Sequence, residues 1–163
     1  MNAVKKEIEK KYIEAINMYE YEISANKNVP VDYFINLAFL YWCFAFENFE
    51  FIIPNDIPKD LINKGGERFM KIIYLGQDKY PDNLELLFWK RYFLHISYGE
   101  NFTYKECIEL IKNHQKEPSD IPYFFLYQYD KEMYKSQKNK LLKNIEKEKT
   151  AKNLYIISIL SQQ

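Results

Sequence analysis

The stretch LAFLYWCFAFENFEF, residues 37–51, places seven aromatic rings in fifteen positions, together with two glutamates and an asparagine. Only 14 uncharged residues separate Asp32 from Glu47. A helix needs about 20 apolar residues to cross the hydrocarbon layer of a membrane, so this stretch is too short to span one. It therefore predicts a buried helix in a globular protein.

The few polar residues of this helix, expected over about 30–50, share one side. At about 100° per residue they fall within an arc of about 60°. They are Asp32, Asn36, Cys43, Glu47 and Glu50. The rest of the circumference is apolar, so we expect a central helix that exposes only this polar strip. Burying each of its large rings should stabilise the fold by about 2 kcal/mol. These rings belong to Phe39, Trp42, Phe46 and Phe49.

Most of the remaining chain shows the spacing of amphipathic helices. Apolar residues recur at three- and four-residue steps over 4–23, and Glu7 and Lys11 stand in the order that favours a surface ion pair worth about 0.3 kcal/mol. A further helical segment, 57–79, contains Gly65-Gly66. This glycine pair is either a break between two helices or a close helix crossing.

Helix boundaries are clearest in the second half of the chain. Asp82 or Asn83 can cap a helix that runs to Tyr98 and ends at Gly99. Thr103-Tyr104-Lys105-Glu106 is a capping box that opens the next helix. Residues 136–163 form one long helix or two short ones, and their β-branched run leaves an edge strand open as a less favoured reading.

The predicted fold is all-α. No other segment shows the two-residue alternation of a half-buried strand. We expect a single domain over 1–163, with seven to eight helices stacked as antiparallel hairpins.

Composition excludes several classes of function. The 23 basic and 23 acidic residues cancel, which removes the general attraction to nucleic acid. Cys43 and Cys107 have no cysteine or histidine at ligand spacing beside them, so neither a disulfide framework nor a zinc site is expected. The amino terminus lacks a secretory signal. We therefore predict a cytoplasmic protein without cofactor or metal, which binds neither nucleic acid nor membrane.

No catalytic residues are predicted. The signatures of serine hydrolases, zinc peptidases, phosphate loops and dinucleotide-binding folds are all missing. A less favoured alternative is an enzyme of unknown type that uses Cys107 or His95. We interpret His114, near the end of its helix, as a group that meets exposed backbone carbonyls.

Charge is nevertheless segregated along the chain. Residues 28–58 contain no lysine or arginine, whereas residues 131–152 hold eight lysines and three glutamates. Both can be ordinary solvated faces, but an acidic strip bordered by rings also suits a partner with a basic surface. The predicted partner-binding residues there are Asp32, Glu47, Glu50 and Asp56. A second candidate surface is a tyrosine series on one helical side, Tyr123, Tyr127 and Tyr134.

Three aromatic segments suggest a family. The segment YPDNLELLFWKRYF (80–93) is similar to the turn between helices of tetratricopeptide repeats, although the full repeat pattern is not met. With LAFLYWCFAFENFEF and PYFFLYQYD (122–130), the chain resembles the small all-α immunity proteins of bacterial polymorphic toxin and contact-dependent inhibition systems. The resemblance implies a protein that neutralises a cognate toxin domain, usually a nuclease with a basic surface. A helical scaffold that binds extended peptides is the alternative.

Overall fold

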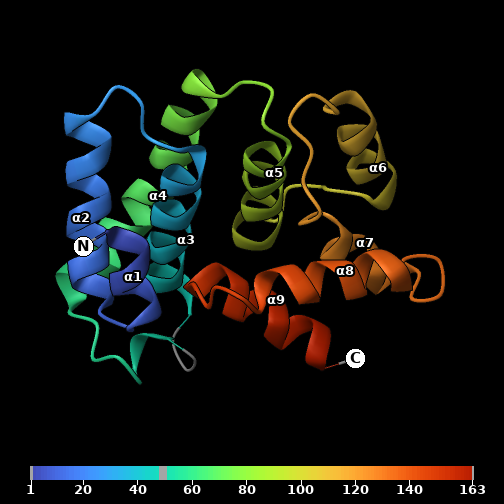
Figure 1. Ribbon diagram of the computed structural model, residues 1–163. Coiled ribbons are helices and arrows are strands. Elements are labelled where there is room, and N and C mark those ends of the chain that lie inside the picture. Colours follow the sequence, from blue (N-terminus) through green and yellow to red (C-terminus); the bar gives the residue numbers. More distant parts are fainter. Residues whose placement is uncertain (1, 48–50, 163) are drawn as a thin grey trace. The chain divides into compact units, whose positions relative to one another are not determined.

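The computed structural model describes residues 2–47 and 51–162, and within these ranges helices are joined by turns and loops, with no strands (Figure 1). The absence of strands there confirms the all-α prediction, whereas the predicted number of seven to eight helices is wrong. The described part of the chain contains nine helices, which are α1 (Ala3–Ile8), α2 (Tyr12–Ala25), α3 (Val31–Phe46), α4 (Lys59–Lys79), α5 (Leu84–Tyr98), α6 (Tyr104–Asn113), α7 (Tyr123–Tyr129), α8 (Lys135–Ile145) and α9 (Ala151–Ser161). None of these helices is long and apolar enough to cross a membrane.

The chain divides into two compact units. The N-terminal unit comprises residues 1–79 with 150–152, and therefore contains α1 to α4 and the first residues of α9. The C-terminal unit comprises residues 80–149 and 153–163. A single domain over 1–163 and tetratricopeptide-like stacking remain predictions.

The first helix expected from the sequence is interrupted at Lys10. This residue has a φ of 60°, and the backbone N–H of Lys11 donates to the carbonyl of Lys6 at 2.9 Å. The N–H of Lys10 donates to the carbonyl of Glu7 at 2.9 Å, which completes a Schellman motif. The left-handed position is taken by lysine instead of the usual glycine, and the apolar spacing continues through it, so periodicity alone misses the break.

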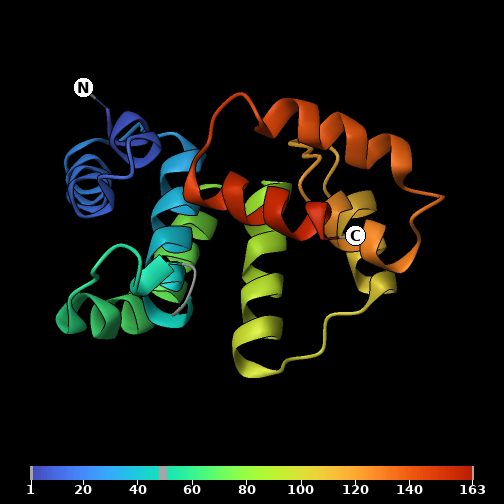
Figure 2. The same ribbon diagram turned by 90° about the horizontal axis from the view of Figure 1, so that it is seen from below.

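Helix α3 forms the centre of the N-terminal unit. Its residues 34–44 are all buried, and α3 contacts both α2 and α4 (Figures 1 and 2). Burial of Phe39 and Trp42 is confirmed. The expected burial of Phe46 is wrong because 42% of this residue is exposed. Phe49 lies outside the described residues.

The glycine pair marks a close helix crossing. Helix α4 continues through Gly65 and Gly66 without a break. A Cβ atom on Gly65 would lie 2.4 Å from the carbonyl oxygen of Tyr41, whereas one on Gly66 would lie 3.8 Å from the Cβ of Ala45. Gly65 is therefore the residue that lets the backbones of α3 and α4 approach each other.

Aromatic rings fill the core of the C-terminal unit. Phe88, Trp89 and Phe124 are fully buried, with the Phe124 ring centre 5.6 Å from that of Phe88 and 5.7 Å from that of Trp89. Helix α5 carries two of them. As predicted, the Asn83 side chain caps α5 by accepting a hydrogen bond from the Leu86 N–H at 3.0 Å, and Gly99 ends it with a φ of 71°.

Two helices, α8 and α9, occupy the final stretch of the chain. Residues 154–160 are helical, so the edge strand left open by the sequence does not form. This resolves the choice for residues 136–163 in favour of two helices.

Candidate protein-binding surface

The polar strip predicted on α3 is not a continuous surface. Asp32 is exposed in the first turn and Glu47 is half-buried at the C-cap, about 22 Å apart along the helix axis. Between them, Asn36 and Cys43 are each only 3% exposed. The expected exposure of the strip is therefore wrong at its centre. Glu50 lies outside the described residues.

The buried centre of the strip belongs to the packing between α2 and α3. The Asn36 amide donates to the hydroxyl of Tyr19 on α2 at 3.3 Å. Burial, reinforced by the carboxylates of Glu47 and Glu7, raises the pKa of the Cys43 thiol well above its usual value. This part of α3 is therefore a structural element and not a contact surface.

The structure describes residues 51–57 of the connection between α3 and α4, and backbone hydrogen bonds tie them to the acidic C-terminal end of α3. The backbone N–H groups of Phe51 and Ile52 donate to the Glu47 carbonyl at 3.0 and 2.8 Å. The N–H of Ile57 then donates to the Ile52 carbonyl at 3.1 Å, and that of Asp56 donates to the Ile53 carbonyl at 3.3 Å. These bonds fold the connection into a compact turn next to the end of α3.

Apolar side chains are exposed at the end of α3 and on this turn, and each is close in sequence to a carboxylate. Ile53 is 62% exposed and Phe46 is 42% exposed. Glu47 follows Phe46 directly, and Asp56 is exposed three residues after Ile53. We call these four residues, Phe46, Glu47, Ile53 and Asp56, the connection surface. The sequence identified its acidic members but assigned Phe46 to the core and did not single out Ile53.

A cavity of about 190 Å³ adjoins the connection. Its lining consists of Lys10, Lys11, Tyr12, Ile13, Glu14, Asn55 and Ile57. The Tyr12 ring lies 4.5 Å from that of Phe51, which fixes the start of α2 against the connection. Lys10 and Lys11 thus bring basic groups close to a segment that has none of its own. These lysines are more than 40 positions away from the connection in the sequence. The distribution of charge along the sequence therefore does not show that they lie close to it.

The tyrosine series does not form an exposed helical side. Tyr127 and Tyr134 are buried, and Tyr134 precedes α8 instead of continuing α7, so their expected exposure is wrong. Tyr123 is half-buried, with its ring 6.0 Å from that of Tyr134. The hydroxyl of Tyr134 instead shares a hydrogen bond of 2.9 Å with the Tyr104 hydroxyl. The exposed tyrosine of α7 is Tyr129, which sequence reasoning overlooked.

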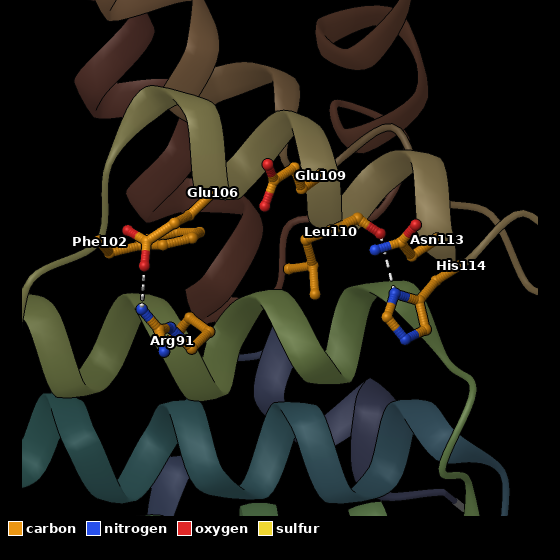
Figure 3. A pocket seen from close by; sticks show the side chains of 7 residues that line it. All are labelled: Arg91, Phe102, Glu106, Glu109, Leu110, Asn113 and His114. Atoms are coloured by element: carbon orange, nitrogen blue, oxygen red, sulfur yellow. Dashed lines mark hydrogen bonds and ion pairs between the residues drawn. The ribbon is translucent and has the colours of Figure 1, made fainter.

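A second cavity, of about 230 Å³, lies between α5 and α6 (Figure 3). Its lining residues are Arg91, Phe102, Glu106, Glu109, Leu110, Asn113 and His114. The Arg91 guanidinium donates to the Asn101 carbonyl at 2.8 Å and to Glu106 at 3.3 Å, and it lies over the Phe102 ring. His114 Nδ1 lies 2.8 Å from the Leu110 carbonyl, which confirms its predicted role at the helix end.

Polar groups in this second cavity mainly hold α6 in place. The Thr103 backbone N–H, 2.7 Å from Glu106, and the Thr103 hydroxyl lower the pKa of Glu106, with a smaller contribution from Arg91. The predicted capping box is thus formed. Arg91 and Glu106 are bonded to each other and to the backbone. They are therefore less available to a ligand than the side chains of the connection surface.

Cys107, one of the two side chains that an enzyme of unknown type would use, is poorly suited to catalysis in this arrangement. Cys107 is buried, and burial raises its pKa to about 12, so the nucleophilic thiolate is scarce at neutral pH. His95 Nδ1 lies 2.7 Å from the Glu100 carbonyl. Within residues 2–47 and 51–162, no group of three or more histidine, cysteine, aspartate or glutamate side chains could hold a metal ion.

No protein-family model matches the chain, and no curated protein or solved structure matches it either. Among the surfaces described above, the connection surface combines exposed apolar side chains with the acidic charge that the sequence indicated.

Proposed function

We propose that the chain is a non-catalytic protein-binding module and that the connection surface contacts its partner. The observation that carries this proposal is the exposure of Phe46 at the end of α3 and of Ile53 on the turn of residues 51–57, each close in sequence to a carboxylate, Glu47 or Asp56. Apolar side chains surrounded by polar groups are typical of the centre of a protein interface. An ordered turn also loses little conformational entropy on binding.

The charge around this surface favours a basic partner. Residues 28–58 carry four carboxylates and no lysine or arginine. The nearby Lys11 is paired with Glu9 at 3.2 Å, which reduces its contribution to the local charge. An acidic surface would accelerate encounter with a positively charged protein and disfavour acidic competitors.

The most specific form of the proposal is an immunity protein that neutralises a cognate bacterial toxin domain in the cytoplasm. The all-α fold and the aromatic segments agree with the resemblance to such proteins, and a toxin that acts on nucleic acid would supply the basic surface. Two buried cysteines without a disulfide are compatible with a reducing compartment.

The test measures binding to the toxin domain encoded beside the gene. Isothermal titration calorimetry compares the wild type with Ile53→Asp and with the double variant Glu47→Lys/Asp56→Lys. We expect each variant to weaken binding by about tenfold or more. Ile53→Asp places a charge in the centre of the interface, where it must lose its hydration, and the double variant reverses the charge of the acidic surface. Circular dichroism of Ile53→Asp should remain unchanged, since Ile53 is exposed.

Leu75→Asp is the matched control. Leu75 is 50% exposed on α4 and lies outside the connection surface. Leu75→Asp therefore makes the same kind of change, from an exposed apolar side chain to a carboxylate, elsewhere in the N-terminal unit. It should leave the affinity unchanged. Normal affinity of Ile53→Asp together with weakened binding of Leu75→Asp would contradict the proposal and locate the contact on α4.

A scaffold that binds extended peptides remains the second candidate because a cavity adjoins the connection. The hollow beside Ile13 and Ile57 could accept a side chain of such a peptide. This function predicts comparable affinity for many related peptides. Affinity for one toxin domain only, in a complex of defined stoichiometry, would argue against it.

A further inference from the structure

A further cavity, of about 220 Å³, lies between α5 and α7 in the C-terminal unit. Tyr92 and Phe125 are its buried members. Ile96 is 39% exposed and Tyr129 is 56% exposed, so the cavity leads from solvent to buried rings. The proposed function makes no use of it. Its lining residues are Tyr92, His95, Ile96, Phe125, Gln128 and Tyr129.

The aromatic wall of this cavity is fixed by its neighbours. The Phe125 ring lies nearly parallel to the Phe102 ring, with 5.0 Å between the ring centres. The Tyr92 hydroxyl shares a hydrogen bond of 2.7 Å with the Tyr155 hydroxyl. The Tyr129 ring centre lies 5.2 Å from that of Phe125. Side chains that are already ordered lose little conformational entropy when a ligand binds, so the cavity is largely preformed.

His95 provides the cavity with an unused hydrogen-bond acceptor. Its Nδ1 lies 2.7 Å from the Glu100 carbonyl oxygen. Because a carbonyl only accepts, Nδ1 carries the hydrogen, and the neutral ring keeps its lone pair on Nε2. Within the described residues Nε2 has no hydrogen-bond partner. Gln128 adds a second acceptor, because its Nε2 donates to the Phe124 carbonyl at 3.3 Å and leaves Oε1 available.

The cavity offers no partner for a charged ligand. None of its six lining residues is a lysine, an arginine, an aspartate or a glutamate. Arg91, which precedes Tyr92, donates to the Asn101 carbonyl at 2.8 Å. Asp130, which follows Tyr129, accepts a hydrogen bond of 2.9 Å from the backbone N–H of Met133. A charged ligand would therefore lose hydration without gaining an ion pair, which favours an uncharged one.

The size of the cavity and its rings favour a planar aromatic ligand. A cavity of about 150 Å³ with apolar walls holds benzene, whereas drug-sized ligands occupy about 300 Å³ or more. The volume of about 220 Å³ therefore suits one ring or two fused rings. Aromatic walls bind such a ring by stacking or edge contacts. A quaternary ammonium ion is also attracted to ring faces, but it carries no donor for His95 Nε2.

We propose that this cavity binds a small uncharged aromatic molecule that carries one N–H or O–H group, of the indole or phenol class. The rings of Tyr92, Phe125 and Tyr129 contact the ligand ring, and His95 Nε2 accepts its hydrogen bond. The cavity belongs to the C-terminal unit, whereas the connection surface belongs to the N-terminal unit. Its test needs no toxin domain, so it succeeds or fails independently of the proposed function.

The experiment is a two-dimensional NMR titration of the isotope-labelled full chain at mildly alkaline pH, which favours neutral imidazole. Indole should bind with a dissociation constant on the order of 0.1–1 mM and shift the backbone amide signals of α5 and α7. Benzofuran has nearly the same shape but no N–H group, so it should bind about fivefold more weakly. Benzoate should bind more weakly than indole because its charge finds no partner.

Two variants locate the site. Ile96→Trp places a larger side chain in the cavity and should weaken indole binding by about tenfold. Ile8→Trp is the matched control, because Ile8 is 42% exposed in the N-terminal unit, and it should keep the affinity. His95→Phe retains a ring but removes Nε2, so it should abolish the preference for indole over benzofuran. Unchanged melting temperatures of the two tryptophan variants would verify folding.

Several results would overturn the proposal. They are no binding of indole at millimolar concentrations, equal affinity for indole and benzofuran, tighter binding of benzoate or tetramethylammonium, and unchanged affinity of Ile96→Trp. N-acetyltryptophanamide, which carries its indole between two peptide groups, is the last probe. Tighter binding of this amide than of indole would assign the ring to a side chain of a protein partner and overturn a free ligand.

Discussion

Glu7 is a carboxylate that is only 1% exposed and yet has strong hydrogen-bond partners. It accepts a hydrogen bond of 2.6 Å from the Tyr19 hydroxyl and one of 2.8 Å from the backbone N–H of Ala151. The predicted surface pair with Lys11 is therefore wrong. Glu7 instead places a negative charge at the N-terminus of α9, where backbone N–H groups lack partners within the helix.

Replacement of Glu7 by glutamine tests the importance of this buried charge. The variant Glu7→Gln should lower the free energy of unfolding by about 2–3 kcal/mol, because a neutral amide forms weaker bonds and turns an N–H group toward existing donors. Urea denaturation measures the change. Glu9→Gln, at an exposed position two residues later, should cost no more than about 0.5 kcal/mol. Equal effects at both positions would contradict this account.

The close crossing of α3 and α4 leads to a prediction about the stability of this helix pair. Gly65→Ala would place a methyl group 2.4 Å from the Tyr41 carbonyl oxygen, so the helices must separate, at a cost of about 2 kcal/mol or more. Gly66→Ala has room and should stabilise α4 by about 0.5–1 kcal/mol. Thermal and urea unfolding of the two variants would reveal the difference in sign. Two stabilising substitutions would show that the helices are not closely packed there.

The capping box of α6 predicts a dependence on pH. Because Thr103 lowers the pKa of Glu106 in the folded chain, the ionised side chain stabilises the fold above the ordinary glutamate pKa of about 4.3. That contribution is lost as pH falls through the lowered pKa. The melting temperature of the wild type should therefore exceed that of Glu106→Gln at neutral pH, and the gap should close in acid.

Glu109→Gln provides the control for this measurement. Glu109 is exposed on the same helix and belongs to neither half of the capping box. It should change the melting temperature little at either pH. A gap between wild type and Glu106→Gln that stays constant from neutral to acidic pH would contradict the assignment.

Across the whole molecule, the local sequence patterns predicted the helices more accurately than they predicted which side chains are exposed. Asn83, Gly99 and the Thr103 capping box act within one or two turns, so their roles could be deduced from sequence spacing. The left-handed Lys10 could not, because lysine rarely takes that conformation. The exposure of Phe46 and the burial of Tyr134 depend on contacts between distant segments, which helical periodicity does not specify.

We propose that the chain acts by binding and not by catalysis. The most direct measurement titrates the activity of the cognate toxin domain with increasing amounts of the purified chain. If the chain is a binding module, the toxin activity should fall in proportion to the amount of chain added and reach zero at one chain per toxin domain. The result should not depend on incubation time. Complete inactivation by far less than one equivalent, progressing with time, would show turnover and contradict the account.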